Sequence, residues 1–343
     1  MAIHTYYVDG DVGDDANDGL SEGASGAKLT INAGLALMSG GQQDTLYVKA
    51  SVTYAEAVVW TAAGQAANPL RMVGYTTTPG DNGQVTIDAT GNTYGISQAR
   101  NYTTTENFIV DGATSHGFFG SFADYIGYYN CVSQNNGGAG FMADDYCSWH
   151  GCEAYSNTGY GIDAGRYSSV YNSIMGENTA GGYDGTDNVG NLLHGCIFYG
   201  NGSGTRYEAR CSFGTNFVNC TFDGRYVSGT HYGIYGISGP HNILNCAFIN
   251  CGIAINATSY ESASGGGANA FYNNSTDIVT WDPYWNPEGN ITADPKFTDD
   301  TSEDYTLASD SPLIGAARGG GDIGALQYDH SGDTGGGRIV YAG

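Results

Sequence analysis

The chain has 343 residues, of which 13% are charged, and its 35 acidic residues against 11 basic ones give a formal net charge of −24. So strong a negative charge repels nucleic acid and anionic membranes, and neither is expected as a partner. No run of 18 apolar residues occurs in the sequence, which argues against a membrane-spanning helix. The length could form two domains, but a repeat that occupies most of the chain favours one elongated body with distinct ends.

Residues 1–43 are predicted to form the entry to that body. Residues 6–8 favour a strand, residues 9–19 a turn-rich acidic loop, and residues 30–38 a short amphipathic helix. The threonine that begins this helix is a favourable N-cap, and a Gly-Gly pair follows the helix as its stop. No apolar leader precedes the first strand, so a protein made and assembled in the cytoplasm is expected.

The acidic loop at residues 9–19 has enough carboxylates to bind a calcium ion, which prefers oxygen ligands. It lacks the bidentate glutamate that an EF-hand loop has at its twelfth position, and capping of the turn by the same carboxylates is the favoured alternative. No cofactor is required, and calcium remains possible. Its candidate ligands are Asp9, Asp11, Asp14, Asp15 and Asp18.

Residues 107–250 contain a short pattern that returns about every 22 residues. Its most regular position follows Asn or Gly and is usually a cysteine, with intervals of 21, 21, 23, 24 and 26 residues. Mostly apolar residues recur three positions before it and two positions after it. The members of this column are Cys131, Cys152, Ser173, Cys196, Cys220 and Cys246.

Each repeat is interpreted as strand, turn, strand and turn, with period-two alternation inside the strands. A Gly- and Asn-rich unit of this length without helical periodicity is typical of one coil of a parallel β-helix. Coils stack roughly 4.8 Å apart, so residues in equal phase lie above one another. The cysteines are then expected inside as reduced thiols, and a column of asparagines is expected to form hydrogen-bonded ladders: Asn136, Asn157, Asn178 and Asn201. A sandwich of short strands is the alternative.

Segments on both sides of the repeat resemble a known family. They are residues 6–9 (YYVD) and 13–20 (GDDANDGL) near the start, and residues 293–297 (ADPKF) and 322–325 (DIGA) near the end. They resemble the opening and closing segments of right-handed parallel β-helix proteins of the pectate-lyase-like superfamily, which includes phage tailspikes and other virion-associated β-helices. The resemblance implies an all-β, single-stranded right-handed parallel β-helix, a solenoid of about ten coils with an N-terminal capping helix. It does not decide activity, because the superfamily includes lyases, hydrolases, epimerases and structural proteins.

Three segments are therefore expected. Residues 1–43 are the N-terminal strand, acidic loop and capping helix, and residues 44–327 are the parallel β-helix with its closing segment. Residues 328–343 form a Gly-rich tail, which is expected to dock on a neighbouring subunit, where residues 338–341 could add a β-strand.

One candidate catalytic cluster is predicted on the outside of the coils. Asp163 and Asp184 each follow the glycine of their coil by two residues, and Glu208 is predicted to occupy the matching place on the next coil. Stacked acids must share protons or bind a cation, and one of them would gain the raised pKa that a glycosidase needs. Arg166 and Arg210 stand beside them, as a lyase of the superfamily would require. A solvated acidic edge, softened by these arginines, is the favoured alternative.

A second outward column is aromatic and is predicted to contact a glycan or another subunit. The ordinary β-propensity of tyrosine is the alternative, and the histidines in the column lie too far apart to share a metal ion. Two tryptophans from a looser aromatic stretch are assigned the same role. These residues are Tyr129, His150, Tyr171, His194, Trp281 and Trp285.

Three observations together predict the function. No export signal is visible, the tail is expected to be ordered, and no catalytic motif of the superfamily occurs. They favour a virion-associated structural β-helix of bacteriophage type, such as a tailspike, tail fibre or capsid decoration, assembled in the host cytoplasm. It is expected to form a homotrimer or to bind other virion proteins, and to contact cell-surface polysaccharide. The alternative is a polysaccharide lyase or glycoside hydrolase, including a phage depolymerase, and a secreted adhesin is the third possibility.

Overall fold

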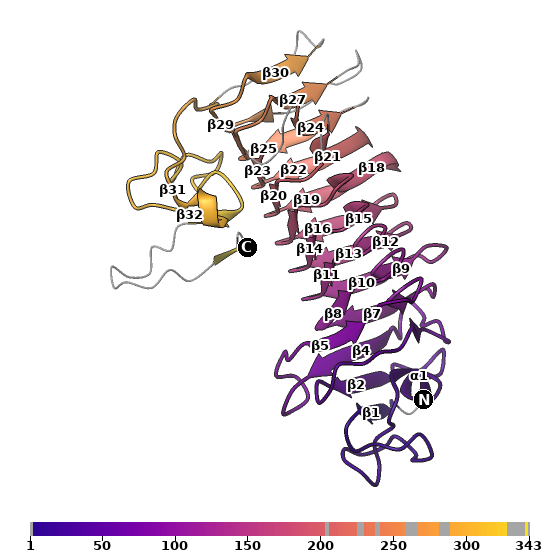
Figure 1. Ribbon diagram of the computed structural model, residues 1–343. Coiled ribbons are helices and arrows are strands. Elements are labelled where there is room, and N and C mark those ends of the chain that lie inside the picture. The colour runs from indigo at the N-terminus through magenta and orange to yellow at the C-terminus, as the bar shows by residue number, and fades with distance from the viewer. Residues whose placement is uncertain are drawn as a thin grey trace. The chain divides into compact units, whose positions relative to one another are not determined.

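The computed structural model describes residues 3–202, 206–224, 230–236, 241–257, 266–280, 289–327 and 340–341. The chain divides into two compact units, unit 1 (Met1–Gly165) and unit 2 (Arg166–Gly343). In both units short parallel strands are stacked coil upon coil (Figure 1). No helix among the described residues is both long enough and apolar enough to cross a membrane.

Unit 1 begins with the predicted strand, loop and helix. The helix α1 (Ile31–Leu35) is shorter than predicted and has Thr30 as its N-cap, whose side chain accepts a hydrogen bond from Ala33 N. The carboxylate of Glu56 accepts hydrogen bonds from the backbone amides of residues 31 and 32, which also lack partners inside the helix. Ile31 and Leu35 are buried, so this short helix is held by packing at the start of the coils.

The strands of unit 1 form three parallel sheets, A, B and C. Sheet A contains β1 (Thr5–Asp9), β2 (Thr45–Lys49), β4 (Leu70–Tyr75), β7 (Thr103–Glu106), β10 (Ile126–Tyr129) and β13 (Ser148–His150). Sheet B contains β5 (Val85–Asp88), β8 (Phe108–Asp111), β11 (Val132–Gln134) and β14 (Glu153–Tyr155). Sheet C contains β3 (Val58–Val59), β6 (Ile96–Ser97), β9 (Phe118–Gly120), β12 (Phe141–Ala143) and β15 (Tyr160–Ala164).

Unit 2 repeats the same three sheets. Its sheet A contains β16 (Ser169–Tyr171), β19 (Leu192–His194), β22 (Asn216–Val218), β25 (Asn242–Leu244) and β28 (Gly266–Gly267). Its sheet B contains β17 (Ile174–Gly176), β20 (Ile197–Tyr199), β23 (Thr221–Asp223), β26 (Ala247–Ile249) and β29 (Ala270–Tyr272). Its sheet C contains β18 (Gly181–Val189), β21 (Tyr207–Phe213), β24 (Tyr232–Gly236), β27 (Ile253–Ala257) and β30 (Thr276–Thr280).

The protein is thus an all-β parallel β-solenoid with three parallel sheets and almost no helix, as the sequence predicted. It has about nine turns, one fewer than expected. Its interior consists of stacked side chains. In unit 2 the rings of Phe198, Phe222 and Phe248 stack at centroid distances of 4.8 Å. All eight cysteines are buried thiols, which confirms that the cysteine column points inward in the reduced state.

In the coils between residues 102 and 200, each turn of the chain from one sheet to the next has a backbone position with positive φ. In unit 1 the turn between sheets A and B uses Asn107, Asn130 and Gly151, with φ of 63°, 50° and 60°. Asparagine and glycine tolerate this left-handed conformation better than other residues. The recurrent Asn and Gly in the sequence are therefore needed to close each coil.

The predicted asparagine ladders are present inside each unit. In unit 1, Asn157 Oδ1 accepts hydrogen bonds from Asn136 N (3.1 Å) and Asn136 Nδ2 (2.8 Å), and Asn157 Nδ2 donates to Ser133 O (3.0 Å). Both asparagines are buried. One side chain therefore provides partners for three polar groups of the preceding coil.

Ile291 forms one more parallel bridge, to Ala270 of β29, and the described segment that follows it does not continue the coils. It contains the antiparallel pair β31 (Phe297–Asp299) and β32 (Asp304–Leu307), with the 3-10 helix η1 (Asp300–Ser302) between them. Leu313 and Ile323 pack against Ala247 and Ala270 of sheet B, and Tyr305 Oη donates to a carboxylate oxygen of that sheet at 3.0 Å. The predicted closing segment therefore covers the outer face of sheet B in unit 2, whose strands β20, β23 and β26 are buried throughout.

The tail pairs within its own chain where it is described. β34 (Val340–Tyr341) forms an antiparallel pair with β33 (Leu326–Gln327). A strand was predicted at this place, and it has a partner in the same chain. Docking of the tail on a neighbouring subunit stays a prediction.

Substitution of Asn157 by alanine is expected to lower the free energy of unfolding by about 3 kcal/mol, because it leaves several buried backbone and amide groups without a partner. Denaturant unfolding measures the change. Thr158→Ala, at an exposed neighbour that keeps its backbone hydrogen bond to Asn136, is the control and is expected to change stability little. Equal effects of both substitutions would contradict the role of the ladder.

Candidate functional site

The outer face of sheet C in unit 2 contains part of the predicted acid column. Strands β18 and β21 pair so that Asp184 lies opposite Arg210, and β24 continues this column with Tyr235. Because Tyr183 pairs with Ala209, Glu208 is out of phase with Asp184. The prediction that Glu208 stacks on Asp184 was therefore wrong by two residues along the strand.

Asp184 and Arg210 form a bidentate ion pair. Arg210 Nε lies 3.2 Å from Asp184 Oδ1, and Arg210 Nη2 lies 2.6 Å from Asp184 Oδ2. The Asp184 side chain is 8% exposed and that of Arg210 is 28% exposed. Two parallel hydrogen bonds fix the plane of the guanidinium group, so it keeps one orientation at the surface of the sheet.

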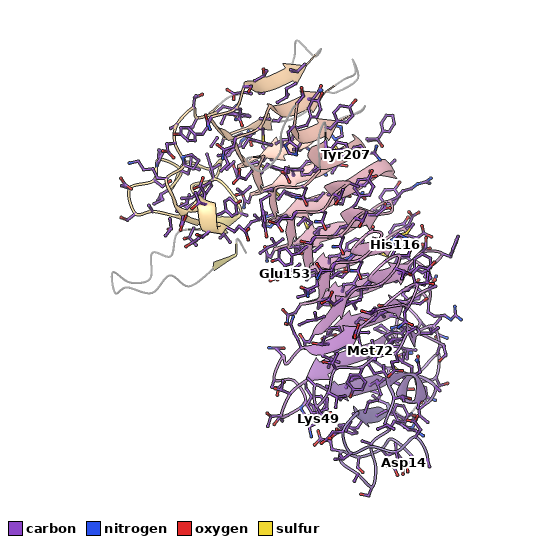
Figure 2. All side chains as sticks on the ribbon, in the orientation of Figure 1. Asp14, Lys49, Met72, His116, Glu153 and Tyr207 are labelled. Atoms are coloured by element: carbon purple, nitrogen blue, oxygen red, sulfur yellow. The ribbon has the colours of Figure 1, made fainter. Side chains whose placement is uncertain are left out.

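One tyrosine ring lies beside this ion pair, and two more tyrosine rings continue from it. The guanidinium carbon of Arg210 lies 5.3 Å from the ring centroid of Tyr207. Tyr207 stacks with Tyr235 at 6.0 Å and 20°, and Tyr232 meets Tyr235 at 5.1 Å and 60°. Figure 2 labels Tyr207 among the side chains of this region. Asp184, Arg210, Tyr207, Tyr232 and Tyr235 are called the sheet C cluster below.

The cluster combines the groups that recognise sugars. Aromatic rings pack against the apolar C–H faces of a sugar ring, while phenol hydroxyls and a guanidinium group exchange hydrogen bonds with its hydroxyls. The side chains come from three neighbouring strands of a stacked sheet, so their positions are fixed by backbone hydrogen bonds. A site on rigid elements of this kind suits an extended ligand that lies across the strands.

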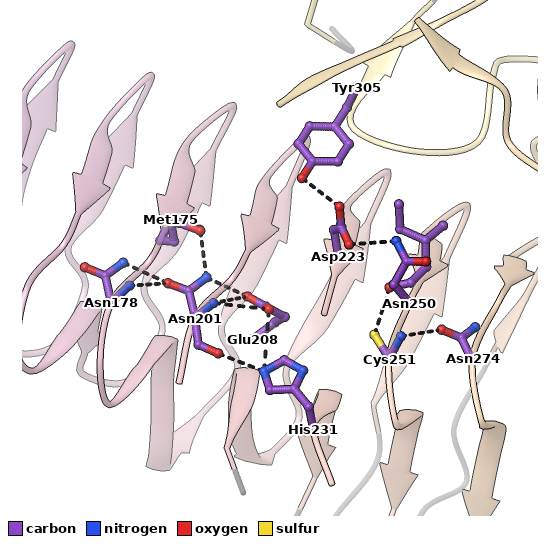
Figure 3. A network of polar contacts seen from close by, with 11 residues as sticks. Met175, Asn178, Asn201, Glu208, Asp223, His231, Asn250, Cys251, Asn274 and Tyr305 are labelled. Carbon is purple, nitrogen blue, oxygen red and sulfur yellow. Dashed lines mark hydrogen bonds and ion pairs between the residues drawn. The ribbon is translucent and has the colours of Figure 1, made fainter. Parts of the chain in front are cut away.

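Glu208, in contrast, is buried and does not reach the outer face. Its carboxyl group binds Asn201, with Oε2 2.5 Å from Asn201 Nδ2 and Oε1 3.3 Å from Asn201 N (Figure 3). Burial raises the pKa of Glu208 well above its ordinary value, although the hydrogen bonds from Asn201 oppose this. Glu208 therefore belongs to the interior ladder of asparagines, and the outward position predicted for it is corrected.

His231 accompanies Glu208 in the interior. Its Nε2 atom lies 2.8 Å from Asn201 O and 3.5 Å from Glu208 Oε1 (Figure 3). A carbonyl oxygen accepts only, so Nε2 carries the hydrogen. Burial lowers the pKa of His231 to about 4. Near neutral pH the histidine is therefore uncharged, and it adds no positive charge beside the Glu208 carboxyl group.

Glu208→Gln is expected to remove a pH dependence of stability. Because the pKa of Glu208 is higher in the folded protein than its ordinary value of 4.5, the wild type loses stability as pH rises from about 4.5 toward the folded pKa. Glutamine has no proton to lose in this window. Urea unfolding between pH 4 and 8 should show that the variant gains stability relative to the wild type as pH rises.

His231 gives an opposite slope, because its pKa is lowered and stability is lost as pH falls from 6.5 to about 4. This slope is expected in both proteins and cancels in their difference. Glu153→Gln, in β14 of unit 1, is the control for loss of a carboxylate at a partly exposed position. A constant difference between the wild type and Glu208→Gln across the window would overturn the assignment.

The remaining predicted catalytic residues lie in different units. Asp163 is half-buried in β15 of unit 1, in register with Met142 of β12. Arg166 is exposed and belongs to unit 2. Their catalytic roles stay predictions, whereas Asp184 and Arg210 are directly paired.

The predicted aromatic column is present as ring pairs within each unit. In unit 1, Tyr129 stacks on His150 at 4.7 Å and 5°, and in unit 2, Tyr171 meets His194 at 6.2 Å and 46°. Partial burial lowers the pKa of both histidines. Their roles in glycan or subunit contact stay predictions, and the two tryptophans assigned to the same role, Trp281 and Trp285, lie outside the described residues.

Carboxylates of the acidic loop bind groups of the protein itself. Asp9 contacts Lys49 Nζ at 3.0 Å and Ser51 Oγ at 2.8 Å, and Asp15 Oδ1 accepts hydrogen bonds from the amides of residues 29 and 30. Figure 2 labels Asp14 and Lys49 in this part of unit 1. Among the described residues no group of three His, Cys, Asp or Glu side chains is arranged to hold a metal ion. Capping of the turn is the arrangement observed, and a calcium site stays a prediction for Asp9, Asp11, Asp14, Asp15 and Asp18.

Sequence reasoning missed one surface ladder in unit 1. Tyr102, Tyr125 and Tyr146 stack at 4.6 Å and 5.0 Å, within 10° of parallel. All three have positive φ, between 56° and 60°, which is uncommon for a bulky residue. Their intervals of 23 and 21 residues equal the repeat period, and this signal could have found them.

No family model matches the chain, and no curated protein matches its sequence. Among solved structures it is similar to the crystal structure of pectate lyase Pel9A, with a TM-score of 0.61 and 15% identity over 96% of this chain and 97% of that chain. It is also similar to a rhamnogalacturonan lyase, with a TM-score of 0.50 and 13% identity over 86% and 91% of the two chains. The protein therefore has the pectate lyase-like parallel β-helix fold, and the phage tailspike type stays a prediction.

Proposed function

We propose that the protein binds a polysaccharide on the outer face of sheet C in unit 2. The observation that carries this proposal is the sheet C cluster, in which an ion pair orients a guanidinium group beside the buried ring of Tyr207. The partly exposed rings of Tyr235 and Tyr232 continue from it across the face. Rings, hydroxyls and oriented hydrogen-bond donors on adjacent strands are the combination that a chain of sugars requires.

The covering of sheet B supports the choice of face. In unit 2, residues 293–325 pack over sheet B and bury its outer side chains. Sheet C keeps partly exposed residues in its outward column, including Arg210 and Tyr235. Solved structures of the same fold include proteins described as pectate lyase and rhamnogalacturonan lyase, so this fold also occurs in proteins that act on polysaccharides.

Tyr235→Ala is expected to weaken glycan binding by up to about tenfold, because a stacking ring contributes about 0.5–1.5 kcal/mol beyond its buried area. Titration calorimetry with a glycan selected from a polysaccharide panel measures the change. Tyr272→Ala is the control, because this tyrosine is exposed in the same unit but lies on sheet B. Equal losses for the two variants would count against a site on sheet C.

Cleavage of the bound polysaccharide is the second candidate, since Asp184 offers a carboxylate within the cluster. An enzyme would release reducing ends, or products that absorb at the wavelength of an unsaturated sugar. A polysaccharide that binds without either product would leave a binding function alone.

The virion-associated structural role and the secreted adhesin stay predictions from the sequence, as do trimer formation and the site of assembly. A homotrimer in light scattering would favour the virion role. A monomer that cleaves polysaccharide would favour the lyase or hydrolase.

A further inference from the structure

We infer that the sheet C cluster selects uncharged glycans and excludes polyuronates, and that Asp184 is the residue that sets this preference. The inference rests on the proposed function, because it names the substrate class of the same site. It is carried by the charges of the outer face, by the ion pair and by the burial of Asp184.

Positive charge is scarce in the strands of this face, although Arg206 is exposed directly before β21. Among the five strands of sheet C in unit 2, whose bounds run from Gly181–Val189 to Thr276–Thr280, only β21 contains a basic residue, Arg210. A carboxylated sugar chain would need such a charge at repeated positions, because each sugar brings its own negative charge. One guanidinium group could bind one carboxylate at most.

Asp184 already compensates that single guanidinium charge. Both of its carboxylate oxygens bind Arg210, at 3.2 Å and 2.6 Å. The carboxylate is 8% exposed, so water screens the pair weakly and a competing sugar carboxylate would have to displace a partly buried one. The pair therefore has no net charge of its own.

The surroundings add to this preference. The chain as a whole carries a net charge of −24, so a polyanion is repelled at long range. Glu208 and His231 lie in the interior beneath the face and contribute hydrogen bonds to the asparagine ladder. A neutral sugar meets none of these penalties and still uses the tyrosine rings and the oriented guanidinium group.

The test compares polygalacturonate with its methyl-esterified form, in which a methyl group removes each negative charge, and includes neutral galactan, xylan and β-glucan. The wild type is expected to bind at least one neutral glycan and to bind polygalacturonate at least about tenfold more weakly at equal ionic strength. Asp184→Asn removes the negative charge that faces Arg210 while preserving shape, and it is expected to raise affinity for polygalacturonate about tenfold.

The double variant Asp184→Asn/Arg210→Gln is the matched control, because it again has no net charge at this position. It is expected to lose the gain for polygalacturonate, and circular dichroism of each variant reports that the coils are intact. Tighter binding of polygalacturonate than of every neutral glycan by the wild type would overturn the inference. The inference would also be overturned if the folded Asp184→Asn variant still binds neutral glycans but does not gain affinity for polygalacturonate. Failure of all proteins to bind any glycan would instead overturn the proposed function, and the inference with it.

Discussion

Parallel stacking of coils is the constraint on which the rest of the structure depends. Each residue meets the residue in equal phase on the next coil at the spacing of neighbouring strands, so like side chains must tolerate one another. Phenylalanine, asparagine and neutral thiols satisfy this condition in the interior, because rings stack, amides alternate as donor and acceptor, and thiols pack as small apolar groups. Charged residues of opposite sign also satisfy it, as with Asp184 and Arg210.

The same constraint explains how a glutamate is accommodated inside unit 2. Glu208 stands where the ladder needs a group that binds an asparagine amide, and its two oxygens bind Asn201. An ionised carboxylate in this place would have no compensating charge within the interior, so the folded state favours its protonated form. Stability and proton binding are thereby coupled at a point that makes no contact with solvent.

Periodicity in the sequence was sufficient to predict the fold, the inward cysteines and the asparagine ladders, because each depends on equal phase alone. It was insufficient for the acid column. The partner of Asp184 lies 26 residues along the chain, two more than the interval to Glu208, since coils in this region contain longer turns. The residue types in these strands do not reveal the correct register either. Tyrosine occurs at buried positions of sheet C, such as Tyr183, and at outward positions, such as Tyr235. The covering of sheet B by residues 293–325 was also unpredictable, because its contacts join segments far apart in the sequence.

Charge pairing links the stacking constraint to the proposed substrate. A solenoid with few basic residues can present a guanidinium group at its surface in two ways, either open to solvent or fixed by an acid on the adjacent strand. Here Asp184 lies in register with Arg210 and is nearly buried. It orients the guanidinium group and also neutralises its charge. Such a site recognises hydroxyl groups by geometry and is poorly suited to carboxylates, which require an uncompensated cation. The backbone register that builds the coils is therefore also what determines the charge of the glycan that the outer face can accept.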